Sequence, residues 1–292
     1  MNEIYLVGFP PAIPYSELYI YYLSGKVPAD ARPAFKDFIG NWEEDGFSYL
    51  FFSKPAQKQI AALLGAWPKL TLLDSFHMSY EAWQGAPVTS LQIGKFYVRP
   101  PWAPEPPPSG CLSIIMDPGV VFGTGTHATT KDCLEAIDIA MCSDKCDSVL
   151  DLGTGTGLLA LAAARCGCSR GVAVDLNALA AETAAVNVRM NGLEDRILVV
   201  RGRAEDFIAV SADLLIANIH YEIMRQLIHT SGFVEKKWFI LSGLMRSEAK
   251  AVREFLGRAP VRILREWSSD GIWHTFLGTG GNAVAPGKNL IT

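Results

Sequence analysis

The stretch that decides the fold is VLDLGTGTG, residues 149–157, where an apolar run ends in a turn with three glycines. The apolar residues before Gly153 are typical of a buried strand, and LLALAAARCG after Gly157 is typical of a helix. The three glycines therefore lie where a strand is expected to turn into a helix. Glycine at such a turn lets the backbone bend sharply and approach a ligand without a Cβ in the way.

Strands and helices alternate regularly on the carboxyl side of this turn. We expect helices at residues 157–167, 177–192, 221–230 and 245–257, and strands at residues 148–153, 171–176, 196–202, 212–219 and 237–243 and in the two halves of 261–278. Continuous apolar strands between helices predict a parallel sheet covered on both faces. The SSDG sequence within residues 261–278 predicts a hairpin that adds an antiparallel edge. The fold class is therefore α/β, with a Rossmann-like seven-stranded sheet.

The N-terminal third has a different pattern. Strand-like segments at residues 16–24, 46–53 and 70–78 surround a helix-like segment at 56–67, which predicts a small α+β domain over residues 1–80. Six of the seventeen prolines fall in residues 99–110, which predicts an extended loop. We therefore expect residues 81–112 to connect the small domain to a larger domain formed by residues 113–292.

Composition restricts the class of protein. Of the 292 residues 49 % are hydrophobic, enough for a sizeable core, and the net charge of −4 argues against a broad basic face, so we expect no direct nucleic-acid binding. The six cysteines form no CxxC pair, which predicts reduced cytoplasmic thiols and no metal site. No apolar run approaches the length of a membrane span, and the start of the chain, with an acid at Glu3, does not resemble a signal peptide.

Two carboxylates near the glycine turn indicate which ligand it holds. Asp175 closes the next strand, where a carboxylate can accept both hydroxyls of a ribose. Asp151 lies two residues before Gly153; a buried acid there would repel a pyrophosphate but suits the cationic amino and sulfonium groups of S-adenosylmethionine. A dinucleotide remains the alternative, because Gly155 begins a partial GxGxxA match that ends at Ala160. We favour S-adenosylmethionine.

A second glycine-rich segment, DPGVVFGTGTHATT at residues 117–130, carries a family resemblance together with ANI at residues 217–219. These motifs resemble the PrmA family of methyltransferases, and the similarity extends through EAWQ, RPPW and ILSGL to GIWHTFL. The first eighty residues match the family only in length and α+β character. The resemblance implies a class I methyltransferase that uses S-adenosylmethionine to methylate lysine or α-amino groups, with ribosomal protein L11 as the protein partner.

The resemblance also assigns cofactor-binding positions, which fall on Thr130, Gly153, Asp175 and Asn218. Thr130 would lie near the start of a helix, with its hydroxyl and neighbouring N–H groups available to the cofactor's carboxylate. The first glycine-rich segment would form a lid, in which Phe122 either covers the cofactor or belongs to the core. The candidate cofactor-binding residues are Thr130, Asp151, Gly153, Gly155, Gly157, Asp175, Asn218 and Phe122.

The candidate catalytic residues are Asn218, His127 and His220. Asn218 follows the fourth strand, beside the expected methyl acceptor, and could hold an amine; alternatively, it caps the helix at residues 221–230. A lysine amine with a pKa of about 10.4 is mostly protonated at neutral pH. Alignment of the reacting atoms can contribute about 7–11 kcal/mol, so a dedicated base is not required. His127 and His220 are the candidates if a base exists; alternatively, His127 stabilises a loop and His220 is a surface residue at a helix start.

The sequence leaves alternative functions open. The divergent first eighty residues allow a class I methyltransferase that modifies another protein or a small molecule. A protein that binds S-adenosylmethionine without turnover is a further alternative, disfavoured by the intact Asp151, Asp175 and Asn218. RNA methylation is disfavoured by the charge balance.

Overall fold

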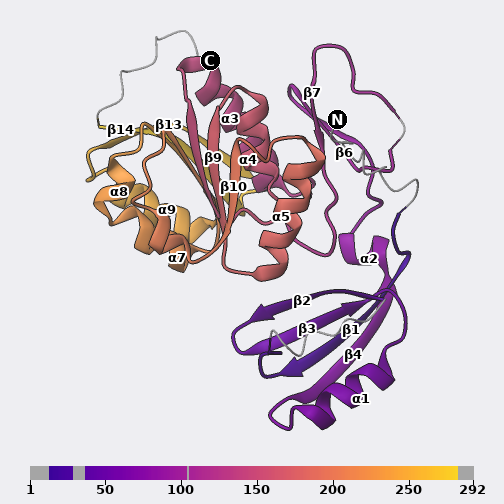
Figure 1. The fold of residues 1–292 in the computed structure, drawn as a ribbon. Helices are drawn as coiled ribbons and strands as arrows, with labels where there is room; N and C mark the ends of the chain where they lie inside the picture. Colours follow the sequence, from indigo (N-terminus) through magenta and orange to yellow (C-terminus); the bar gives the residue numbers. More distant parts are fainter. Residues whose placement is uncertain (1–12, 29–36, 104, 282–292) are drawn as a thin grey trace. The chain divides into compact units, whose positions relative to one another are not determined.

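The structure, a computed structural model, describes residues 13–28, 37–103 and 105–281. The N-terminal residues considered above for a signal peptide lie outside these ranges. The chain divides into two compact units: the first runs to Thr89 and includes Pro100–Glu105 and Asn177–Leu179, and the second comprises Ser90–Arg99, Pro106–Leu176 and the residues from Ala180 onward (Figure 1).

The first unit is an antiparallel sheet in the order β2-β3-β1-β4 with helix α1 (Gln57–Ala66) against one face and helix α2 (Tyr80–Gln84) after the last strand. Its strands are β1 (Glu17–Ser24), β2 (Phe38–Glu44), β3 (Phe47–Phe52) and β4 (Thr71–Ser79). Alternate residues of β1 and β3 pack on Ile60 of α1, since side chains two apart on a strand share a face. This is the expected α+β class. Strand β2 was not predicted, because FIGNWEE combines a glycine and two acids, which are depleted in strands.

The second unit contains the predicted seven-stranded sheet, in the order β10-β9-β8-β11-β12-β14-β13. Its strands are β8 (Ser148–Leu152), β9 (Arg170–Asp175), β10 (Ile197–Arg201), β11 (Leu214–Asn218), β12 (Trp238–Met245), β13 (Val261–Ser269) and β14 (Trp273–Gly280). The five strands from β10 to β12 are parallel, and β14 and β13 form the predicted antiparallel edge. The strand order reverses between β8 and β11, which is where open α/β sheets bind ligands.

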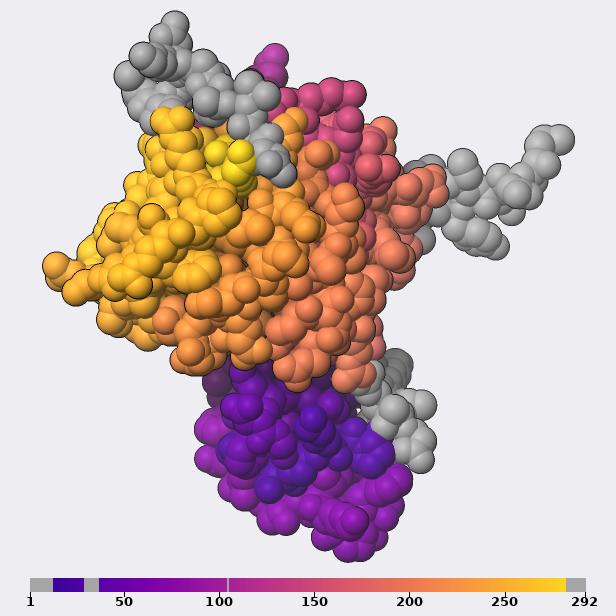
Figure 2. All heavy atoms as spheres, turned by 90° about the vertical axis from the view of Figure 1, so that its left-hand side faces the viewer, coloured from indigo at the N-terminus to yellow at the C-terminus, as the bar shows by residue number. Residues whose placement is uncertain are grey.

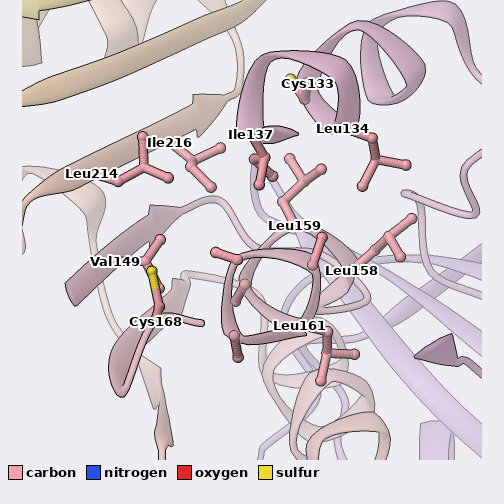
Figure 3. Packing of buried hydrophobic residues seen from close by; sticks show 14 of the residues in the cluster. Cys133, Leu134, Ile137, Val149, Leu158, Leu159, Leu161, Cys168, Leu214 and Ile216 are labelled. Carbon is pink, nitrogen blue, oxygen red and sulfur yellow. The ribbon is translucent and has the colours of Figure 1, made fainter. Parts of the chain in front are cut away.

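Helices cover both faces of this sheet, which gives three layers (Figure 1). One face carries α3 (Ala128–Ser143), α4 (Leu158–Arg165) and α5 (Ala178–Met190), and the other carries α6 (Ala204–Phe207), α7 (Tyr221–Ile228), α8 (Ser231–Val234) and α9 (Arg246–Leu256). On the first face, labelled side chains of α3, α4, β8 and β11 meet in one core (Figure 3). The hairpin of β13 and β14, in yellow, lies at the surface seen in Figure 2.

Local sequence signals set several element ends. The side-chain oxygen of Asn177 accepts a hydrogen bond of 3.0 Å from the N–H of Leu179, so it caps α5 as predicted. Between β13 and β14, Asp270 and Gly271 both have positive φ, +55° and +63°, and the N–H of Ile272 donates to the carbonyl of Ser269. Positive φ at two successive residues is the conformation that Asp-Gly favours in tight hairpin turns, and three residues separate the paired ends Ser269 and Trp273.

A small sheet in the order β5-β6-β7 belongs to the second unit. Its strands are β5 (Leu91–Ile93), β6 (Phe96–Arg99) and β7 (Leu112–Ile115), and two of them lie in the segment expected only to connect the domains. Ile93, Phe96 and Ile114 are buried in the same core as α3 and α4. Between β6 and β7, the described residues of the proline-rich segment form neither helix nor strand, as predicted.

Candidate functional site

The candidate site lies at the carboxyl edge of the parallel strands, where β8, β9 and β11 end at Leu152, Asp175 and Asn218. Because parallel neighbours end at the same edge of a sheet, side chains that follow these strands converge. The contacts described below connect the glycine turn at residues 153–157, here called the cofactor turn, with the first glycine-rich segment at residues 117–127, here called the entry segment.

The cofactor turn requires glycine at its first two glycine positions. Gly153 and Gly155 have φ values of +73° and +56°, a region that L side chains rarely adopt. A Cβ on Gly153 would overlap the Cγ2 of Ile219, and a Cβ on Gly155 would lie 2.7 Å from the carbonyl oxygen of Phe122. The backbone of the turn therefore packs directly against β11's end on one side and the entry segment on the other.

Asp151 is buried beneath the start of α4, with 1 % of its surface exposed. Its carboxylate accepts hydrogen bonds from the Thr154 hydroxyl at 2.6 Å and from the Ala160 N–H at 3.2 Å. Burial raises its pKa to about 6, the charge of Asp175 adds to that rise, and the two hydrogen bonds oppose it. A cation bound nearby would favour the ionised form of this carboxyl group.

Asp175 is half-buried at the end of β9, and its carboxylate accepts a hydrogen bond of 2.9 Å from the Gly155 N–H. Two large apolar side chains near the turn are exposed: Leu176, which follows Asp175, by 62 %, and Phe122 of the entry segment by 72 %. Phe122 is therefore not a core residue. The sequence analysis did not name Leu176 as a site residue. Its position, an apolar residue directly after the acid that ends a strand, could have indicated it.

Thr130 is buried in the first turn of α3. The N–H groups expected to face a ligand there already have partners in the protein. The N–H of Thr129 donates to the Nδ1 of His127, and the N–H of Thr130 donates to the His127 carbonyl at 3.1 Å. These two N–H groups are therefore bonded within the protein, and the Thr130 hydroxyl stays the candidate ligand.

His127 is the N-cap of α3. Its Nδ1 lies 2.8 Å from the Thr129 hydroxyl, and its ring packs edge-on against Trp273. The same Thr129 hydroxyl accepts a hydrogen bond of 3.4 Å from the amide of Asn218. Thr129, which the sequence did not single out, thus connects two of the three candidate catalytic residues.

The alternative role of Asn218 as a helix cap is not what the structure shows. The residue at the N-cap of α7 is His220, which is exposed; among the described residues its side chain caps no backbone N–H. Asn218 is the last residue of β11 and lies opposite Ser242 of β12. Its side chain lies on the α3 side of the sheet, toward Thr129.

The two glycine-rich segments are bonded to each other. The Thr156 hydroxyl in the cofactor turn donates a hydrogen bond of 2.7 Å to the carbonyl of Gly123 in the entry segment. Behind both segments lies Asn187 of α5, which has no exposed surface and bonds to Thr156 and Asp117. Sequence reasoning missed Asn187, although its spacing of four residues from Asn191 was a usable signal.

Within residues 13–28, 37–103 and 105–281, no group of three or more His, Cys, Asp or Glu side chains is placed to hold a metal ion. No helix of the described ranges is long and apolar enough to cross a bilayer. All six cysteines lie in the described part of the chain and are free thiols.

The chain was compared with known protein families. Residues 78–279 match the family described as ribosomal protein L11 methyltransferase (PrmA). The ribosomal protein L11 methyltransferase of Desulforamulus reducens is 35 % identical over 190 residues, which cover 64 % of this chain and 61 % of that protein. The one from Anoxybacillus flavithermus is 38 % identical over 172 residues, which cover 58 % of this chain and 54 % of that protein. The matched region thus spans between about half and three-fifths of these relatives.

Comparison with solved structures gives a consistent result. The crystal structure of the ribosomal protein L11 methylase from Lactobacillus delbrueckii subsp. bulgaricus superposes with a TM-score of 0.57 at 25 % identity. The superposition covers 66 % of this chain and 98 % of that chain.

Proposed function

Because the chain belongs to the ribosomal protein L11 methyltransferase (PrmA) family, a family of class I methyltransferases that use S-adenosylmethionine, we propose that it methylates lysine or α-amino nitrogens of a protein, ribosomal protein L11 first among them. The observation that carries this proposal is the cofactor turn with a buried acid, Asp151, before it and a strand-ending acid, Asp175, beside it. The cytoplasm is the proposed place of action.

The residues of the site fit S-adenosylmethionine. Glycine leaves positions 153 and 155 of the turn without a side chain, and Asp175 is the proposed acceptor of the ribose hydroxyls. The exposed apolar side chains of Leu176 and Phe122 supply surfaces for the adenine and for covering the cofactor. Asp151 offers a negative charge to the cationic methionine end, and the Thr130 hydroxyl and Gly157 complete the proposed binding set.

The bound cofactor supplies a methyl group on a positively charged sulfur. The acceptor amine must lose its proton before its lone pair can form the new N–C bond, as the C–S electron pair passes to sulfur. Asn218, at the end of β11, is the proposed holder of this amine, oriented by the Thr129 hydroxyl. Alignment alone can contribute about 7–11 kcal/mol, so we assign the proton's departure to solvent rather than to His127 or His220.

The first unit bears on the identity of the methyl acceptor. The family match begins at residue 78, so strands β1, β2 and β3 and helix α1 lie outside it. We propose that this first unit selects the substrate. Methylation of another protein or of a small molecule is the second candidate, because the matched region omits these strands and this helix.

A labelling experiment tests the proposal. Purified protein is incubated with S-adenosylmethionine and a panel of ribosomal proteins. Mass spectrometry then measures, for each ribosomal protein, the increase in mass that corresponds to replacement of hydrogen by methyl. We expect L11 to gain methyl groups on amino nitrogens, and the Asp175→Ala variant to transfer fewer of them when S-adenosylmethionine is limiting. Methylation of another panel member instead of L11 would overturn the substrate, and no transfer to any acceptor would overturn the enzymatic role.

A further inference from the structure

Two buried asparagines, Asn187 of α5 and Asn191 directly after its last residue, pair with the chain that leads into the entry segment. The amide of Asn191 accepts from the N–H of Ile115 at 3.0 Å and donates to the carbonyl of the same residue. The amide of Asn187 accepts from the N–H of Asp117 at 2.8 Å and donates to its carbonyl at 2.9 Å. Each side-chain amide thus makes the pair of hydrogen bonds that a neighbouring strand would make.

The rise per residue of a helix and of an extended chain explains why the two asparagines meet alternate residues of the chain. Four residues of an α-helix rise about 6 Å, and two residues of an extended chain advance about 6.7 Å. Asn187 and Asn191 therefore face alternate residues of the extended chain, Asp117 and Ile115. Both asparagines are buried, so loss of an amide would leave backbone groups without partners in a dry environment.

Asn187 has one contact that Asn191 lacks. Its Nδ2 also donates to the carbonyl of Thr156 in the cofactor turn at 2.9 Å. The hydroxyl of Thr156 in turn donates to the carbonyl of Gly123. Asn187 therefore connects the start of the entry segment to the cofactor turn, and Thr156 connects the turn to the middle of that segment. Asn191 bonds instead to Ile115, to the carbonyl of Asn187 and to Arg165, away from the turn.

We infer that Asn187 is a positioning residue for the cofactor: its single amide sets the cofactor turn and the entry segment at the separation that binding requires. Asn191 anchors the chain before the entry segment without setting the turn. The inference rests on the proposed function for the identity of the ligand. The hydrogen bonds to Asp117 and Thr156 are observed independently of it.

The matched pair Asn187→Ala and Asn191→Ala tests this role in the full-length chain. Binding of S-adenosylhomocysteine is measured by calorimetry, and the free energy of unfolding is measured in urea for each variant. We expect Asn187→Ala to weaken binding at least about tenfold, since the turn loses a buried partner. Asn191→Ala, which also loses buried hydrogen bonds, should change binding by less than about threefold at comparable loss of stability.

Hydrogen exchange in the unsubstituted protein gives a second measurement that does not depend on a variant folding. Binding of S-adenosylhomocysteine should slow exchange of the Asp117 amide, which bonds to Asn187, more than that of the Ile115 amide, which bonds to Asn191. Equal slowing of both, or equal loss of affinity in both variants, overturns the role of Asn187 alone. An unsubstituted protein that binds no S-adenosylhomocysteine overturns the proposed function and this role together.

Discussion

The carboxylate of Asp175 accepts a hydrogen bond of 2.9 Å from the backbone N–H of Gly155, which joins the end of β9 to the middle of the cofactor turn. One side chain thereby fixes the shape of the turn and presents a negative charge beside it. The same residue that is expected to bind the ribose therefore also holds the backbone that the ligand must approach.

Replacing Asp175 with alanine should weaken S-adenosylhomocysteine binding strongly. Hydrogen bonds to charged groups contribute about 1.5–3 kcal/mol, which corresponds to roughly a 10- to 150-fold increase in Kd. Calorimetry measures the change. Asp147→Ala is the matched control, because Asp147 precedes β8 at the opposite edge of the sheet and is partly exposed. Equal losses in both variants would contradict the assignment.

Adding a methyl group at Gly155 should displace the entry segment. A Cβ there would lie 2.7 Å from the Phe122 carbonyl, and backbone cannot move aside as a flexible side chain can. Gly155→Ala should therefore reduce cofactor affinity by about tenfold or more in calorimetric titration. Gly192→Ala is the control: its φ is also positive, +62°, but a Cβ would meet no described atom within 4 Å. Gly192→Ala should lower the free energy of unfolding by about 1–2 kcal/mol and leave the cofactor affinity unchanged.

The features that could be predicted from the sequence all have local causes. Strands β8 to β12 are short apolar runs between helices, the hairpin follows from Asp270 and Gly271, and α5 begins at its cap Asn177. In each case the residues that specify the element lie within it or next to it. The cofactor turn was recognisable for the same reason.

The features that were missed depend on contacts between distant residues. Strand β5 has only three residues, so its pattern is too short to identify without its partner β6. Asn187 and Asp117 are 70 positions apart, and no periodicity relates them. His127 illustrates another limit: a histidine before a helix fits both a cap and a base, and only the bond to Thr129 shows the first role.

The buried Asp151 should make the free energy of unfolding decrease as the pH rises. Its pKa is about 6 in the folded protein against an ordinary value of 3.8, so the folded state holds the proton more tightly than the unfolded state. The free energy of unfolding should therefore decrease between about pH 4 and 6 and stay level above that range, as far as this group contributes. Asp151→Asn should be more stable than the unsubstituted protein at pH 8, by on the order of 3 kcal/mol, in urea unfolding.

The same variant should bind S-adenosylmethionine less well, and it should lose more affinity for that cation than for S-adenosylhomocysteine, which lacks the sulfonium charge. Asp132→Asn is the control. Burial also raises the pKa of Asp132, whose carboxylate accepts from the Thr275 hydroxyl. That variant should gain stability at high pH with no change in the ratio of the two affinities. If Asp151→Asn leaves the ratio of the affinities for S-adenosylmethionine and S-adenosylhomocysteine unchanged, Asp151 does not belong to the cofactor site.

Removing the Asn218 amide should affect turnover more than cofactor binding. Misplacement of a reacting group by about 1 Å can cost about 100-fold in rate, so Asn218→Ala should lower kcat by a factor of that order. Thr129→Val deletes the hydroxyl that orients Asn218 and should lower kcat by a smaller factor. Steady-state kinetics with saturating S-adenosylmethionine measures both. Unchanged kcat in Asn218→Ala would exclude it as the holder of the amine.

Substitutions of His127 can separate helix capping from base catalysis. His127→Ala should lower the free energy of unfolding by about 0.5–2 kcal/mol, because the N–H of Thr129 loses its partner, whereas His127→Asn restores a favoured N-cap side chain. If the ring acts only as a cap, His127→Asn should retain kcat/KM and its pH profile, as should His220→Ala. A base would behave differently: both His127 variants would lose activity to the same extent whatever their stability. We expect recovery with asparagine, because positioning is sufficient for transfer to an amine whose proton leaves to solvent.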